Sequence, residues 1–136
     1  MNVIYKSEYC EVYFSLCDDA AVLSWLPENR CMSEQDFNDQ LDALFNTIEI
    51  YEPRIVYIDA FEFNYPILKH TVNLITHYLN NLSVDIYGIL NSRHLLGNLV
   101  IKKLLAGING SVRIVFFTVH KDKKQRLAEL AEMIMC

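Results

Sequence analysis

This sequence predicts an α/β domain with a mixed, mostly parallel sheet, on three observations. Two extended runs, 9–16 and 20–26, flank the turn residues 17–19, which is the pattern of a hairpin. Strand-like and helix-like periodicities then alternate. The later strand-like runs are almost continuously apolar, as in strands buried on both faces. We therefore expect one domain over residues 1–136, with five strands in the order β-β-α-β-α-β-α-β-α and right-handed crossovers.

The first half of the chain should contain the hairpin and one helix. Pro27 stops the second strand, and Ser33 followed by Asp36 forms a weak capping box at the start of the helix. The helix ends at Glu52 and Pro53. Its apolar stripe comprises Phe37, Leu41, Leu44, Phe45 and Ile48.

Three strand–helix units should follow residue 53. The strands are expected over 54–59, 84–90 and 112–119. The first of the three helices has Pro66 in its first turn, the second is capped by Asn91 and Ser92, and the third spans 121–135. The apolar residues of the middle helix are Leu96, Leu99, Val100, Leu104 and Leu105.

The first eight residues allow two interpretations. The apolar segment Val3-Ile4-Tyr5 is too short to distinguish an extra edge strand from a loose arm. An exposed edge strand could pair two chains, so a homodimer is one expectation for this protein.

Composition excludes several classes of function. The formal net charge is −5 and the basic residues are scattered, whereas nucleic-acid binding needs clustered Lys and Arg. No apolar run is long enough to span a bilayer, and the start of the chain lacks a signal-peptide pattern. The four cysteines form no C-x-x-C pair, which favours reduced thiols. We expect a cytoplasmic protein without a membrane span or a nucleic-acid partner.

No cofactor, metal or catalytic motif is indicated. Four glycines are too few for a phosphate-cradling loop, and His70 and His77 lie seven apart with no third ligand in register. The acids Asp18, Asp19 and Asp59 superficially resemble a phospho-receiver site. A hairpin turn at 17–19, however, would place the first two acids at the sheet end remote from Asp59.

Two segments carry a family resemblance. They are residues 25–37 (WLPENRCMSEQDF) and 58–66 (IDAFEFNYP). Together with the predicted element order, from about Ser7 to the final helix, they resemble the SpoIIAA-like branch of the STAS superfamily, and above all its uncharacterised bacterial members. The resemblance implies a SpoIIAA-like fold and regulation by contact between proteins.

The sequence departs from that family at its regulatory position. Members that antagonise anti-sigma factors carry a phosphorylatable serine after the third strand, in an Asp-Ser-Ser-Gly type motif. Here Asp59 occupies the acid position, but Ala60 follows it and the next Ser or Thr is Thr71. The resemblance therefore implies a non-enzymatic module that works by surface contact or ligand binding, without this phosphorylation.

The loop after the third strand is the best candidate for contact with a partner protein. It combines acids with alternating aromatic residues, which are favoured in interfaces. The aromatic residues could equally form a lid on the core, with Phe63 as the favoured core member. The candidate residues are Asp59, Phe61, Glu62, Phe63, Asn64 and Tyr65, with the nearby helix start at 92–94.

An alternative is a small anionic or apolar ligand at the carboxyl edge of the sheet. Helices that begin at this edge present free amide groups and a positive dipole end. The competing interpretation is that these polar residues only cap helices and fill loops. The candidate ligand-binding residues are Ser92, Arg93, His94, His120 and Lys121.

Overall fold

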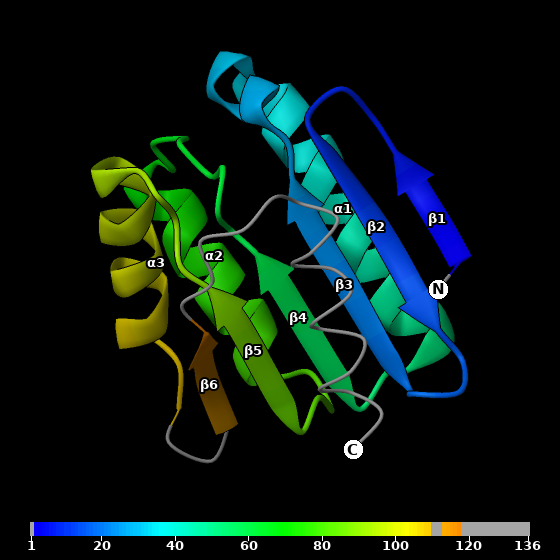
Figure 1. Cartoon of the computed structure of the whole chain (residues 1–136). Coiled ribbons are helices and arrows are strands. Elements are labelled where there is room, and N and C mark those ends of the chain that lie inside the picture. The colour runs from blue at the N-terminus through cyan, green and yellow to red at the C-terminus, as the bar shows by residue number, and fades with distance from the viewer. Residues whose placement is uncertain (1, 110–112, 118–136) are drawn as a thin grey trace.

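The computed structural model describes residues 2–109 and 113–117, and Figure 1 shows their arrangement. In that part of the chain a six-stranded sheet is combined with three α-helices and one 3-10 helix, η1. The elements in order are β1 (Asn2–Lys6), β2 (Cys10–Ser15), β3 (Ala20–Trp25), η1 (Pro27–Cys31), α1 (Glu34–Tyr51), β4 (Ile55–Asp59), α2 (Lys69–Asn80), β5 (Ile86–Leu90), α3 (Leu95–Ala106) and β6 (Arg113–Phe117).

The strands lie side by side in chain order. Strands β1, β2 and β3 pair antiparallel, and β3 to β6 pair parallel. The α/β class, the hairpin and the parallel later strands are therefore confirmed. The expected count of five strands is one short, because β1 pairs with β2 as an edge strand with an irregular register between Val3 and Tyr5. Dimerisation through this edge remains a prediction.

Helices α2 and α3 begin later than the sequence predicts, because the loops that precede them are longer than expected. The capping box at α1 is present, with Ser33 and Asp36 exchanging both hydrogen bonds. Helix α2 begins at Lys69, so Pro66 lies in the preceding loop and not in the first helical turn. Helix α3 begins at Leu95, with His94 and not Asn91 or Ser92 at its N-cap. The helix expected over 121–135 lies outside the described residues.

One apolar core joins the three α-helices to one face of the sheet. Alternate strand residues such as Val12, Leu23, Val56 and Ile89 contact the buried faces of all three helices. In Figure 1, α1 and α2 lie behind the sheet. Buried helix residues of this cluster are Phe37, Leu44 and Ile48 from α1, Ile75 from α2, and Val100 and Ile101 from α3. This one-sided arrangement follows from right-handed crossovers between successive neighbouring strands.

The opposite face of the sheet carries a second, smaller cluster. Among the described residues it is formed by strands alone: Ala20, Val22, Ile55, Tyr57 and Leu90 are buried, with Tyr13 and Ile86 packed beside them. Burial on both faces explains why these strands are nearly continuously apolar in sequence.

A cavity remains within the core between the sheet and the helices. Its volume is about 110 Å³, and every residue that lines it is aliphatic or aromatic. An apolar space is therefore left between the sheet and the described helices.

Two absences hold for the described part of the chain. None of its helices is both long and apolar enough to cross a bilayer. Nor do three or more His, Cys, Asp or Glu side chains gather there as a metal site would require.

Candidate interaction surface at the carboxyl edge of the sheet

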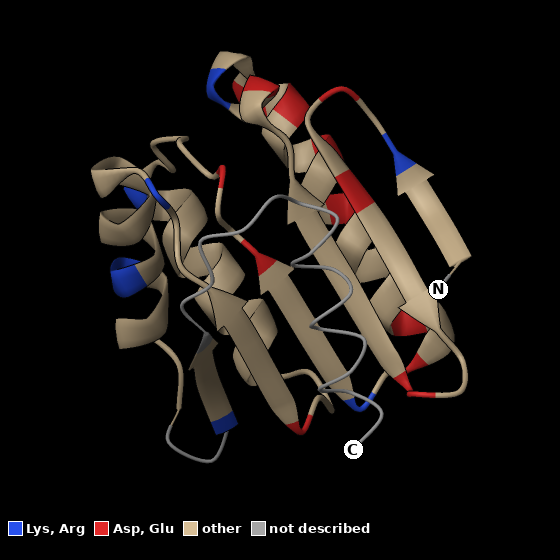
Figure 2. Ribbon diagram, viewed as in Figure 1, with Lys and Arg blue, Asp and Glu red and all other residues tan. Residues whose placement is uncertain are grey.

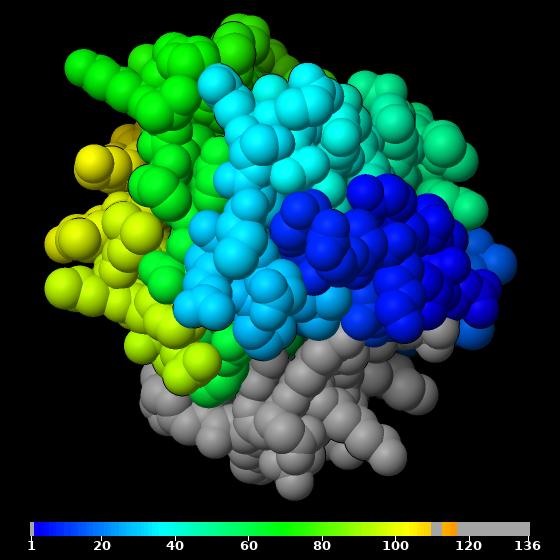
Figure 3. Space-filling view, turned by 90° about the horizontal axis from the view of Figure 1, so that it is seen from above, coloured from blue at the N-terminus to red at the C-terminus, as the bar shows by residue number. Residues whose placement is uncertain are grey.

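The carboxyl ends of the parallel strands meet three other segments. Ser24, Asp59 and Leu90 are in register at the ends of β3, β4 and β5. Beyond them lie η1, the loop 60–68 and the residues that lead into α3. Figure 3 looks onto this edge, with η1 in light blue, the loop in green and the start of α3 in yellow-green. We call this region the carboxyl edge.

Asp59 positions the loop and does not face a partner. Its carboxylate is fully buried; it accepts a hydrogen bond from the Ser24 hydroxyl at 3.0 Å and one from the Phe61 amide at 3.2 Å. The expectation that Asp59 contacts a partner directly does not fit this burial. The turn acids Asp18 and Asp19 lie at the far end of the sheet, where the Asp19 carbonyl accepts the Arg54 amide.

Asn29 joins η1 to the loop. Its side-chain amide donates to the carbonyls of Leu26 and Glu62, both at 2.7 Å. Its side-chain oxygen accepts the Asn64 amide at 2.8 Å. Asn29 is fully buried, so its side-chain amide cannot form hydrogen bonds with water. These three bonds to the protein backbone satisfy it instead. Sequence reasoning assigned Asn29 no role, and an isolated Asn in a loop carries no signal that would predict one.

Ser92 joins the loop to the start of α3. Its hydroxyl donates to the Phe63 carbonyl at 2.7 Å and accepts the His94 amide at 2.9 Å. Asn98 then clamps the Ser92 backbone from the first turn of the helix, with bonds of 2.9 and 2.8 Å. The Ser92 hydroxyl therefore serves the protein's own backbone and is not available to hold an anion.

Gly97 lets α3 approach the loop at backbone distance. A Cβ atom at this position would lie 2.0 Å from the Phe63 carbonyl oxygen and 2.6 Å from the Ser92 hydroxyl. No side chain fits there without moving the backbone. A glycine inside an otherwise helical pattern is a recognised sign of close packing, and that signal could have identified Gly97 from sequence.

The aromatic residues of the loop form mainly a lid. Phe63 is buried against Trp25, with ring centroids 5.1 Å apart. Tyr65 is half-buried and stacks on Phe37 at 4.8 Å, and its burial raises the pKa of the phenol. Phe61 is half-buried, and its carbonyl accepts the Arg93 amide at 2.9 Å. Phe63 and Tyr65 therefore fit the interpretation as a lid on the core. Neither is a freely exposed contact residue for a partner protein.

Arg93 is engaged by Glu62 at the surface of the edge. Its guanidinium donates to both carboxylate oxygens, at 2.6 and 3.3 Å, and this pairing raises the pKa of Arg93. An incoming anion would have to displace Glu62. Of the other basic candidates, His94 is the N-cap of α3, and His120 and Lys121 lie outside the described residues. The anion site gains no support from the described part of the chain.

An exposed apolar patch adjoins the edge on the first turns of α3. Leu95 is 78% exposed, Leu96 38% and Leu99 50%. Spacings of three and four residues make Leu99 the surface neighbour of both other leucines. We call these three residues the α3 leucine patch. Sequence reasoning placed Leu96 and Leu99 in the same apolar set as Val100, of which Val100 is the buried member.

The charged residues of α3 itself are of one sign. Helix α3 contains Lys102 and Lys103 but no Asp or Glu, and Figure 2 shows only basic residues coloured on it. Both lysines are exposed. Helix α3 therefore combines exposed apolar side chains with two positive charges, on a chain whose formal net charge is −5.

Comparison of the chain with known protein families, with curated proteins and with solved structures finds no match. Functional inference therefore rests on the geometry of the carboxyl edge and the α3 leucine patch.

Proposed function

We propose that this protein is a non-enzymatic interaction module of STAS-like type that lacks the phosphorylatable serine and binds a protein partner through the α3 leucine patch. The observation that carries the proposal is the exposure of these leucines beside a preordered edge. Large exposed apolar side chains grouped on one element mark interaction sites more often than scattered ones do.

The carboxyl edge supports the patch by holding α3 in a fixed place. Hydrogen bonds from Asn29, Ser92 and Asn98 connect η1, the loop and the helix start. A partner that binds the patch consequently meets a surface that needs little ordering, which lowers the entropic cost of association.

Charge complementarity defines the partner. Arg93, Lys102 and Lys103 surround the leucines, and only Arg93 has an acidic neighbour at ion-pair distance among the described residues. We infer a protein surface with apolar side chains flanked by Asp and Glu. Such a complex should form more slowly at high salt, because steering between opposite charges is screened.

The STAS-like part of the proposal rests on element order. Parallel neighbours β3 to β6, connected in sequence by helices on one face, support the relationship that residues 25–37 and 58–66 suggest. Ala60 follows Asp59 at the position where the family has its serine. Regulation by phosphorylation at that position is accordingly not part of the proposed function.

Co-purification with a matched control tests the proposal. The patch variant carries Leu95→Ser and Leu99→Ser, and the control carries Ile50→Ser on α1, where Ile50 is 72% exposed. Both changes should alter stability by no more than about 0.5 kcal/mol per residue, because the side chains are on the surface. The same protein should accompany the wild type and the control from their native cells, and be lost from the patch variant.

Two results would contradict the proposal. One is a partner retained by the patch variant at wild-type yield. The other is flotation of the purified wild type with phosphatidylserine vesicles that the patch variant does not show, which would assign the leucines and lysines to a lipid surface instead.

A further inference from the structure

We propose that the core cavity is a binding site for a neutral apolar molecule about the size of one aromatic ring. This site is separate from the α3 leucine patch, and the inference does not depend on the proposed function.

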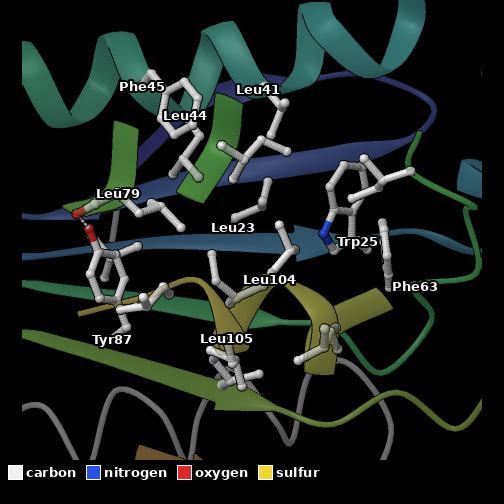
Figure 4. Close-up of a pocket in the computed structure, with 18 of the residues that line it drawn as sticks. Leu23, Trp25, Leu41, Leu44, Phe45, Phe63, Leu79, Tyr87, Leu104 and Leu105 are labelled. Carbon is white, nitrogen blue, oxygen red and sulfur yellow. Dashed lines mark hydrogen bonds between the residues drawn. The ribbon is translucent and has the colours of Figure 1, made fainter. Parts of the chain in front are cut away.

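The cavity lies between the sheet and the three helices. Figure 4 shows Trp25 and Phe63 toward one end and Tyr87 and Leu79 toward the other, with Leu104 between them. The volume of about 110 Å³ is of the same order as an engineered protein cavity of about 150 Å³ that stays dry and binds benzene or xenon. A single ring or a short branched alkyl group therefore matches the space.

The lining defines the chemistry of the ligand. None of the residues that line the cavity is charged, so a carboxylate or an amine would lose its hydration without gaining a partner. The Tyr87 hydroxyl is the polar group seen at one end, where it donates to the Leu79 carbonyl over a long 3.4 Å. Burial raises the pKa of Tyr87 to about 12, so it remains a hydrogen-bond donor at neutral pH. A ligand with one neutral oxygen could accept this hydrogen in place of the Leu79 carbonyl.

The cavity also adjoins the carboxyl edge, because Ala60, Phe63 and Ile67 of the loop 60–68 line it. The Phe63 side chain lines the cavity, while its carbonyl accepts the Ser92 hydroxyl at 2.7 Å. Phe63 is therefore common to the cavity lining and to the hydrogen bonds of the carboxyl edge.

Trp25 provides the readout for a titration with benzene. It is the one tryptophan of the chain and lines the cavity, so its emission should change as benzene binds. At ten times its Kd, benzene should also raise Tm by about 4 °C. Benzoate has the same ring with a negative charge and should do neither. The inference would be overturned if benzene changed neither the Trp25 emission nor Tm. It would also be overturned if benzoate changed both as much as benzene does.

A pair of variants locates the site. Leu104→Phe puts a larger side chain into the cavity and should reduce the benzene-induced rise in Tm at least threefold. Leu99→Phe makes the same change on the exposed side of the same helix and should leave the rise intact. Equal responses in both variants would place benzene elsewhere. The wild-type titration decides the question by itself if Leu104→Phe does not fold.

Discussion

Replacing Gly97 with alanine should destabilise the protein by about 2 kcal/mol, even though alanine is the better helix former. Helix propensity alone would favour alanine by about 1 kcal/mol. The new Cβ, however, would lie 2.0 Å from the Phe63 carbonyl oxygen, which is a backbone atom and cannot rotate away. Overpacking of this kind costs about 3 kcal/mol. Thermal unfolding should show a fall in Tm of about 6–10 °C.

Gly107→Ala at the end of the same helix is the matched control. There the nearest atom to a new Cβ is a methyl group of Thr76, at 2.9 Å, and the backbone is in a conformation that alanine adopts readily. The cost should be below about 1 kcal/mol. An equal loss in both variants, or a Gly97 variant as stable as the wild type, would show that α3 does not pack on the loop as described.

Replacing Asn29 with alanine should cost about 3 kcal/mol. The change removes the three hydrogen bonds of this buried side chain. The Glu62 carbonyl and the Asn64 amide then lose the partner that Asn29 provides. A buried group that loses its partner costs roughly 1–3 kcal/mol. Urea unfolding should show a lower midpoint with an unchanged m-value.

Asn81→Ala supplies the comparison for Asn29. Asn81 is exposed and donates one side-chain hydrogen bond, to the His77 carbonyl at 2.7 Å. Water can replace that bond, so the loss should stay within about 0.5 kcal/mol. If the two asparagine variants unfold at the same urea concentration, Asn29 does not hold η1 to the loop.

The sequence predicted the fold wherever a local pattern reflects burial. Continuous apolar runs identified β4 and β5, and the Ser33–Asp36 pair identified the start of α1. Strand β1 was left undecided because a short edge strand is held by pairing and not by a buried face. The start of α2 was placed too early because Pro66 is compatible with both a first helical turn and an extended loop.

The candidate site was only partly predictable for a different reason. The sequence correctly suggested that the loop after β4 lies beside the residues that lead into α3. The sequence favoured Phe63 as a core residue, and the structure confirms this. The sequence could not show that Asp59 is buried, since exposure depends on neighbours distant in the chain. The same limit applies to Leu95 and Leu99, because an apolar residue on a helix gives no sign of which face meets the core.

Site-specific photo-crosslinking in native cells tests the central claim most directly. A benzophenone amino acid would replace Leu99 in the patch or, as the control, Ile50 on α1. We expect one discrete crosslinked protein at position 99, rich in Asp and Glu at the linked surface, and no such product at position 50. No product at 99, or the same product from both positions, would contradict the assignment of the α3 leucine patch as the interaction surface.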